Sequence, residues 1–307
     1  SAGYLIGSFQ SGKWYDRFPG HLVMAGVLVA MAALMSSLPM VPWLPLLAGA
    51  ILLLGVTNGA LDVGGNTLLV WVHTDRVGPF MNGLHLAWGV GAFLSPLIVA
   101  TSLKLTTDID VAFWVMGLLM LPAAVWLFSL PSPSVATQQA GPSQAAGPAP
   151  VLLASFVIFL ALFAGSEAGF GAWIYTYALK IGLGTEQTAA SLNSAYWAAL
   201  TVGRFLGIPI ATRVAPQRIV VVDLAVALAS ISLIVFLPGS SSALWLGTVG
   251  LGVSLATVFP MALAQAGRSM VMTGKVSRWF FVGASAGGMS IPWLIGQLFE
   301  RVGTQVA

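Results

Sequence analysis

The chain has 307 residues, of which 58% are hydrophobic and only 7% are charged, whereas ordinary soluble domains carry roughly 25% charged residues. So apolar a chain would not stay dispersed in water, and the composition excludes a soluble fold. The net charge is +3 with no polybasic run, so nothing indicates a nucleic-acid partner. Cysteine is absent, and neither a disulfide framework nor a thiolate metal site is expected.

Long apolar segments follow one another along the chain. A membrane-spanning helix needs about 20 apolar residues, so about ten spans fit this length. The first segment is too short to span and lacks the basic start and cleavage site of a signal peptide, so we interpret it as the end of a helix. Hydropathy, with glycine, proline and charged residues as boundaries, predicts helices over 1–11, 22–38, 44–71, 79–103, 111–130, 151–179, 186–211, 219–237, 243–266 and 276–299.

An uncharged stretch rich in Pro, Ser, Gln, Ala and Gly, residues 131–150, has the composition of a linker. It divides the chain into a predicted N-terminal helix bundle, residues 1–130, and a predicted C-terminal bundle, residues 151–307.

The two halves repeat at an offset of about 196 residues. The matched positions include Gly7 with Gly203, Arg17 with Arg213, Gly91 with Gly287, and Pro96 with Pro292. Two parallel multi-helix repeats joined by a central linker resemble the architecture of major facilitator transporters.

Basic residues are distributed unequally between the two sets of alternating loops. The positive-inside rule places the richer set, and with it the linker, in the cytoplasm. That set holds Lys13, Arg17, Arg76, Arg213, Arg218, Arg268, Lys275 and Arg278, and the other holds Lys104, Lys180 and Arg301.

The stretch Gly12-Lys-Trp-Tyr-Asp16-Arg17-Phe-Pro-Gly20-His21 resembles the signature between helices two and three of the major facilitator family. The resemblance implies that the first segment is helix two, and that the chain, with five helices in each half, lacks helices one and twelve. Asp16 and Arg17 are then predicted to pair across the cytoplasmic seam and hold one state of a gate. Ordinary solvation at the interface is the alternative.

Two further motifs resemble a branch of that family. Gly59-Ala-Leu-Asp62-Val-Gly-Gly-Asn66 is similar to a pattern of the fucose–proton symporters, in which a glutamate usually stands at the acidic position. The segment from Gly165 to Tyr177 resembles the sodium-dependent glucose transporters. The resemblance implies a sugar substrate and an ion-coupled mechanism.

Asn58, Asp62 and Asn66 recur every fourth residue and so share one face of a predicted helix. An ionised carboxylate at the bilayer centre costs at least about 2.5–3.5 kcal/mol. Asp62 should therefore face an aqueous cavity or a partner, or carry a proton, and we predict that it is the ion-coupling acid. A neutral acid that is hydrogen-bonded to a neighbouring helix is the alternative.

A second acid lies on a helical face with aromatic residues, where Glu167 is followed by Phe170, Trp173 and Tyr177. Sugars present apolar C–H faces and a rim of hydroxyl groups, and this mixture of rings and an acceptor suits both. Packing alone is the alternative for the aromatic residues. The predicted substrate-binding residues are Asn66, His85, Trp88, Glu167, Trp173, Tyr177, Asn193 and Gln265, with Glu167 also a candidate for ion coupling.

Other polar residues within the apolar segments are candidates as well. Tyr196 is a further polar candidate on the helix that holds Asn193. Arg204, inside a predicted helix, and Arg213, near its end, are predicted to serve the cytoplasmic gate together with Asp16 and Arg17. His85 has an ordinary pKa near 6.5, which permits contact with either a substrate or a proton. A histidine that only packs within the bundle is the alternative.

The stretch Gly283-Ala-Ser285-Ala-Gly287 matches the G-x-S-x-G pattern of serine hydrolases. An activated serine needs a base, yet all three histidines precede it, whereas intramembrane serine proteases place the histidine after the serine. Close packing of helices through small residues explains the motif better. An intramembrane hydrolase is therefore a distant alternative, and we expect no enzyme.

The sequence thus predicts an all-α membrane protein of the major facilitator fold that acts as a secondary active transporter. The predicted function is symport of a monosaccharide with H⁺ or Na⁺ by alternating access, with no other cofactor. A proton-coupled exporter of amphipathic drugs is the alternative. The expected setting is the plasma membrane or the bacterial inner membrane, as a monomer with a cytoplasmic linker.

Overall fold

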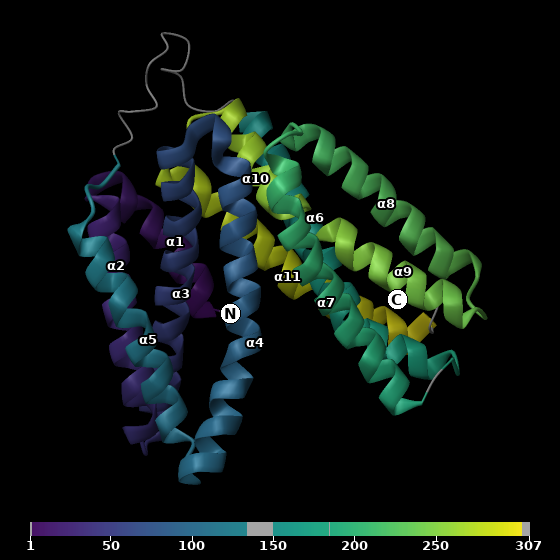
Figure 1. The fold of residues 1–307 in the computed structure, drawn as a ribbon, viewed down its shortest axis with the longest axis horizontal. Coiled ribbons are helices and arrows are strands. Elements are labelled where there is room, and N and C mark those ends of the chain that lie inside the picture. The colour runs from purple at the N-terminus through teal and green to yellow at the C-terminus, as the bar shows by residue number, and fades with distance from the viewer. Residues whose placement is uncertain (1, 134–149, 184, 303–307) are drawn as a thin grey trace. The chain divides into compact units, whose positions relative to one another are not determined.

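The structure, a computed structural model, describes residues 2–133, 150–183 and 185–302. Helices build almost all of this part of the chain (Figure 1). They are α1 (Ala2–Arg17), α2 (Gly20–Ser37), η1 (Leu38–Met40), α3 (Leu44–His73), η2 (Thr74–Arg76), α4 (Val77–Thr106), α5 (Asp110–Ser129), α6 (Pro150–Lys180), α7 (Glu186–Ala211), α8 (Pro216–Phe236), α9 (Ser241–Leu255), α10 (Val258–Ser269) and α11 (Gly274–Val302).

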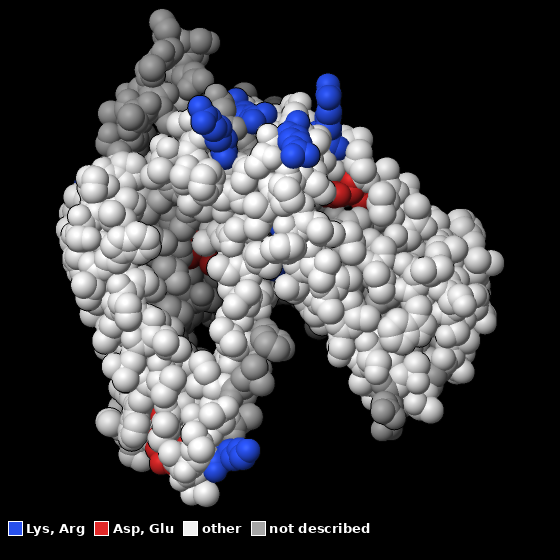
Figure 2. All heavy atoms as spheres, viewed as in Figure 1, with Lys and Arg blue, Asp and Glu red and all other residues white. Residues whose placement is uncertain are grey.

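Several of these helices have the length and apolar composition of membrane-spanning helices. Among the described residues, six segments are long and apolar enough to cross a membrane, including α3, α6 and α8. Figure 2 shows a surface on which charged side chains are few and lie mostly near helix ends. Such surfaces are typical of membrane-embedded helices, because each charged side chain in hydrocarbon is costly.

Local sequence sets several helix ends. Pro216 stands at the first position of α8, where its missing N–H is not needed. The Thr185 hydroxyl caps α7 by accepting from the Thr188 N–H at 3.3 Å, and the Ser240 hydroxyl caps α9 by accepting from the Ala243 N–H at 3.2 Å. Each cap satisfies a donor that the first helical turn leaves unpaired.

The end predicted for the first helix, near residue 11, is wrong. Helix α1 continues to Arg17, so Asp16 and Arg17 lie in its last turn and not in a loop. Gly12, which looks like a helix end in the sequence, is buried inside α1. A Cβ atom at Gly12 would overlap the backbone of Gly274, so close approach of two chain segments explains this glycine.

The segment predicted over 243–266 lies in one candidate span, Ser241–Ser269, but its prediction as an unbroken helix is wrong, because the structure divides it into α9 and α10. The helix is interrupted at Ala256 and Thr257. Pro260 contributes to the break, since it has no N–H to donate to the Ala256 carbonyl four residues earlier.

Contacts group the chain into two compact units. Unit 1 comprises Ser1–Thr74, Ala87–Leu153 and Met270–Val282, and unit 2 comprises Asp75–Leu86, Ala154–Ser269 and Gly283–Ala307. Relative to the halves expected from the sequence, two short segments, 75–86 and 270–282, are exchanged. The predicted division into domains stays a prediction, and residues 134–149 of the predicted linker lie outside the described part.

Each unit has its own helix packing. In unit 1, α1 packs against α3 and α2 packs against α5, and in unit 2, α9 packs against both α7 and α8. A cluster of buried apolar side chains lies where α6, α7 and α9 of unit 2 meet. Its members include Phe163, Tyr196, Leu200, Leu251 and Leu255.

Candidate functional site

The acid of unit 1, Asp62, lies on α3 where that helix meets α1. The Tyr4 hydroxyl of α1 donates to Asp62 Oδ2 at 2.8 Å. Tyr4 reaches this carboxylate because α1 and α3 run very close together: a Cβ atom at Gly7 or Gly59 would overlap the backbone of the other helix. The structure therefore gives Asp62 a neutral hydrogen-bonding partner on a neighbouring helix.

Asn66 follows Asp62 by one helical turn and is 3% exposed. Its amide nitrogen donates to the Asp62 carbonyl oxygen at 2.9 Å, while its Oδ1 is buried without a hydrogen-bond partner. The side-chain oxygen is thus an available acceptor. Asn58, the first member of the predicted polar stripe, is instead exposed.

The acid of unit 2, Glu167, forms an ion pair with Arg204. Glu167 Oε1 on α6 lies 3.3 Å from Arg204 Nη2 on α7, and the two side chains are only 19% and 8% exposed. Arg204 Nη1 also donates to the His85 carbonyl oxygen of α4 at 3.4 Å. The pair is buried and neutral overall, an arrangement that costs desolvation but leaves no uncompensated charge.

Aromatic residues surround this ion pair. The Tyr196 hydroxyl donates to the Glu167 carbonyl oxygen at 3.1 Å, and the Tyr196 ring lies 4.9 Å from that of Phe170. The ring of His85 packs edge-on against Phe259 at 5.2 Å, and His85 Nε2 is buried without a hydrogen-bond partner. Unit 2 therefore brings together the Glu167 carboxylate, the Arg204 guanidinium and aromatic rings from four helices.

The remaining predicted substrate residues have different surroundings. The Trp173 indole N–H donates to the Pro292 carbonyl oxygen at 2.9 Å, which uses its single polar group within unit 2. Asn193 Oδ1 is buried without a partner. Tyr177 packs at the edge of an apolar cluster, and Trp88, in unit 1, is 60% exposed. A substrate contact for each of these residues stays a prediction.

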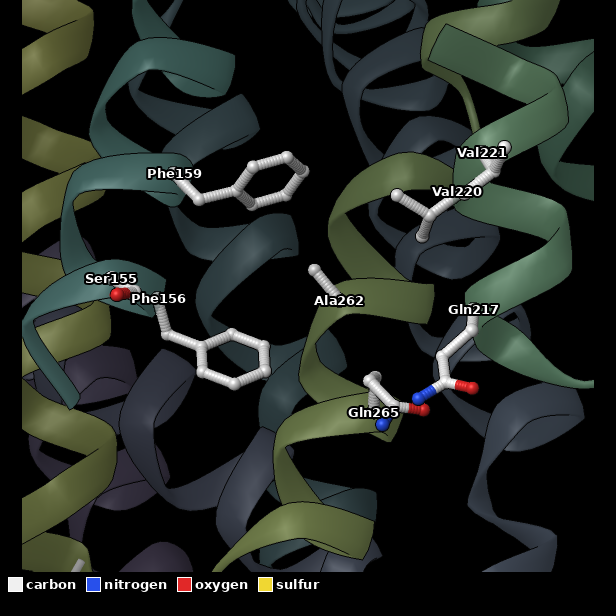
Figure 3. Close-up of a pocket in the computed structure, with 8 residues that line it drawn as sticks. All are labelled: Ser155, Phe156, Phe159, Gln217, Val220, Val221, Ala262 and Gln265. Carbon is white, nitrogen blue, oxygen red and sulfur yellow. The ribbon is translucent and has the colours of Figure 1, made fainter. Parts of the chain in front are cut away.

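Gln265 lines a groove of about 400 Å³ between α6, α8 and α10 of unit 2. Figure 3 shows its side chain beside that of Gln217 at one end, with Phe156 and Phe159 across the groove. The Gln265 amide nitrogen donates to the Ser269 hydroxyl at 3.0 Å. The groove is mostly apolar, and a substrate contact for Gln265 stays a prediction.

Of the predicted gate residues, Asp16 has a defined partner. Its carboxylate accepts from the backbone N–H of Gly274 at 2.6 Å and of Lys275 at 3.1 Å. Asp16 thus caps the first turn of α11, where a carboxylate also complements the helix dipole. Arg17 and Arg213 are exposed, while Arg204 is buried in the ion pair described above.

The glycines of the G-x-S-x-G motif confirm the packing interpretation. A Cβ atom at Gly287 would overlap the carbonyl oxygen of Ala161 on α6, and one at Gly283 would lie 2.8 Å from the Val157 carbonyl oxygen. Both glycines are therefore needed so that α11 and α6 can approach closely.

The sequence alone does not identify Tyr4 as a site residue, nor the hydrogen bond from Tyr196 to Glu167. Tyr4 lies in the short first segment, where nothing local marks it as the partner of Asp62. Tyr196 stands out as a polar ring within an apolar segment, but its bond to the Glu167 backbone does not show in the sequence. The two bonds span 58 and 29 residues.

A bundle of long apolar helices with buried, partnered acids is typical of a polytopic membrane protein. The family model of the Major Facilitator Superfamily matches residues 1–292, and the chain belongs to this superfamily. It is therefore an integral, multi-pass transporter and not an enzyme.

The chain is similar to sugar transporters of vertebrates. It is 28% identical to sodium-dependent glucose transporter 1 of Xenopus laevis over 97% of this chain and 67% of that protein. It is 29% identical to sodium-dependent glucose transporter 1 of Danio rerio over 98% of this chain and 57% of that protein. The chain thus spans only about two thirds or less of these two relatives.

Solved structures show the same fold. A variant of the fucose:proton symporter FucP of E. coli matches with a TM-score of 0.78 at 15% identity, over 99% of this chain and 83% of FucP. The human organic anion transporter MFSD10 matches with a TM-score of 0.79 at 13% identity, over 99% of this chain and 77% of that protein. The predicted major facilitator fold is confirmed.

Proposed function

We propose that the full-length protein is a sugar symporter driven by H⁺ or Na⁺ that works by alternating access. The observation that carries the proposal is the surroundings of Asp62, a part-buried carboxylate whose hydrogen-bonding partner, Tyr4, is neutral. Among the described residues, Glu167 has an arginine partner at 3.3 Å, whereas Asp62 forms no ion pair. Asp62 therefore has a charge that an incoming cation or proton can neutralise.

A monosaccharide suits the polar atoms of unit 2. Sugar hydroxyls donate and accept hydrogen bonds, and this unit holds two buried polar atoms without a partner, Asn193 Oδ1 and His85 Nε2. The similarity to sodium-dependent glucose transporters over nearly the whole chain supports the same substrate class.

Export of anionic or amphipathic drugs is less well supported. An organic anion would need a positive partner, and the buried Arg204 is already neutralised by Glu167. The likeness to MFSD10 is one of fold alone.

The proposal includes a cytoplasmic gate. Asp16 belongs to the first half of the sequence and caps the start of α11 in the second half. Loss of this cap would remove one of the contacts that hold segment 270–282 to α1, a step that opening of the cytoplasmic side would require. Arg17, Arg204 and Arg213 remain predicted members of the gate, and the cytoplasmic placement of the linker is part of the proposal.

The test is transport by the full-length protein in proteoliposomes, with a panel of monosaccharides and with imposed H⁺ or Na⁺ gradients. Asp62→Asn should abolish uphill accumulation of sugar yet leave counterflow of sugar largely intact, because Asn resembles the protonated acid. Asp110→Asn, the same change at the start of α5, is the control and should retain both activities. Accumulation by Asp62→Asn against a gradient would show that Asp62 is structural.

A further inference from the structure

A third acid, Asp223, lies inside an apolar helix of unit 2. It belongs to α8, which is the most apolar of the six candidate spans. Its Oδ2 accepts a hydrogen bond from the Thr257 hydroxyl. Among the described residues, no basic side chain forms an ion pair with this carboxylate. The carboxylate therefore has a polar partner but no neutralising charge.

Thr257 stands at the break between α9 and α10. A broken helix leaves backbone groups without their usual partners, and Pro260 cannot supply a donor to the Ala256 carbonyl. Unwound carbonyls at a helix break are a recurrent means of coordinating Na⁺ inside transporters. The break thus leaves the Ala256 carbonyl without its usual donor, one residue before the threonine that bonds to Asp223.

Asn82 of α4 supplies an independent observation. Its side chain is fully buried, and neither the amide oxygen nor the amide nitrogen has a hydrogen-bond partner. A Cβ atom on Gly207 would meet both the Thr257 methyl group and, at 3.0 Å, Asn82 Nδ2, so the Asn82 amide and the Thr257 side chain both pack at Gly207 of α7. A buried amide without partners is uncommon in folded proteins and indicates a ligand or an ordered water.

We propose that Asp223, Thr257 and Asn82, with the Ala256 carbonyl at the α9–α10 break, form a site for a monovalent alkali cation, Na⁺. The side-chain ligands are a carboxylate oxygen, a hydroxyl oxygen and Asn82 Oδ1, which turns toward the ion when one binds. Hard cations prefer such oxygen ligands. One carboxylate balances one positive charge, so a divalent ion would leave the buried site charged.

The choice of Na⁺ deepens the proposed function, on which it rests, because it names the coupling ion and places it in unit 2. Asp62 in unit 1 is then a second acid that can bind a coupling ion, either H⁺ or Na⁺. Binding of Na⁺ can be measured without transport, so the two proposals fail separately.

The test uses the purified full-length protein and measures binding of radioactive Na⁺ together with thermal unfolding in NaCl, KCl and choline chloride. Wild type should bind Na⁺ and gain thermal stability from NaCl in excess of that from the other salts. Asp223→Asn should raise the half-saturating Na⁺ concentration at least about tenfold, and Thr257→Val and Asn82→Leu should raise it severalfold. Thr248→Val, at a buried threonine inside α9, is the control and should bind Na⁺ as wild type does.

Three outcomes would overturn the site. Unchanged Na⁺ binding in Asp223→Asn, in protein that remains folded, would show that the carboxylate is not a ligand. Loss of Na⁺ binding only in Asp62→Asn would move the ion to unit 1. Stability that depends on pH and not on Na⁺ would identify a proton as the partner of Asp223. If Na⁺ binds through Asp223 while no sugar is transported, the ion site stands and the sugar assignment fails.

Discussion

Removal of the Glu167 charge should destabilise the protein strongly unless the Arg204 charge is removed with it. The Arg204 side chain is only 8% exposed, and the His85 carbonyl oxygen at 3.4 Å is a weak substitute for a carboxylate. Breaking a buried ion pair by removing one partner costs about 3–5 kcal/mol. Glu167→Gln should therefore raise the unfolding equilibrium constant by about a hundred- to a few-thousand-fold.

The double variant Glu167→Gln, Arg204→Gln removes both charges and should recover most of this loss, since neutral replacement of a buried pair is often tolerated. Unfolding of the purified full-length protein by denaturant in detergent measures both effects. Asp110→Asn should change the free energy of unfolding by no more than about 0.5 kcal/mol. A loss below about 1 kcal/mol in Glu167→Gln would refute the reasoning, because the guanidinium would then not need its carboxylate.

Sugar counterflow by the same variants separates stability from function. If Glu167 contacts the substrate, the double variant should be folded yet fail to exchange sugar. If the ion pair is only structural, counterflow should return together with stability.

Other contacts lead to three more predictions. Asp16→Ala should lower the free energy of unfolding by about 0.5–2 kcal/mol through loss of the α11 cap, and Asp16→Asn should lower it less, since it keeps an acceptor; equal losses would argue against capping. Gly287→Ala should lower the free energy of unfolding by about 1–3 kcal/mol or more through overpacking. Gly26→Ala, with open space around the new methyl group, should be neutral or stabilising. A similar effect of both substitutions would contradict the close approach of α11 and α6. A thiol reagent that does not cross the membrane should modify Ser241→Cys from outside and not Arg76→Cys, and the reverse pattern would refute the orientation.

The positions of the helices were predictable because hydropathy and Gly/Pro boundaries are local signals. The two errors have local causes as well. Gly12 resembles a boundary, but its role is to admit the Gly274 backbone, which lies near the other end of the chain. The break at Thr257 does not show in the sequence because the apolar run continues through it, and the effect of Pro260 falls four residues earlier.

The site was predictable only in part. Asp62 and Glu167 stand out because a carboxylate is rare in an apolar segment. Their partners do not stand out in the sequence, because the hydrogen bond from Tyr4 and the ion pair with Arg204 depend on which helices pack together. The helical period of one segment does not show which other segment lies beside it. Asp223 is harder to single out, because no other polar residue near it suggests a shared polar face.

Segment 270–282 has a consequence for how the protein is made. The Asp16 carboxylate, the Thr67 hydroxyl and the Trp71 indole each hydrogen-bond to partners in this segment, at sequence separations of 258, 210 and 201 residues. Chains are synthesised from the N-terminus at about 5–20 residues per second, so these three groups leave the ribosome about ten seconds or more before their partners exist. In that interval the first helices lack these hydrogen bonds and are accessible to chaperones and proteases.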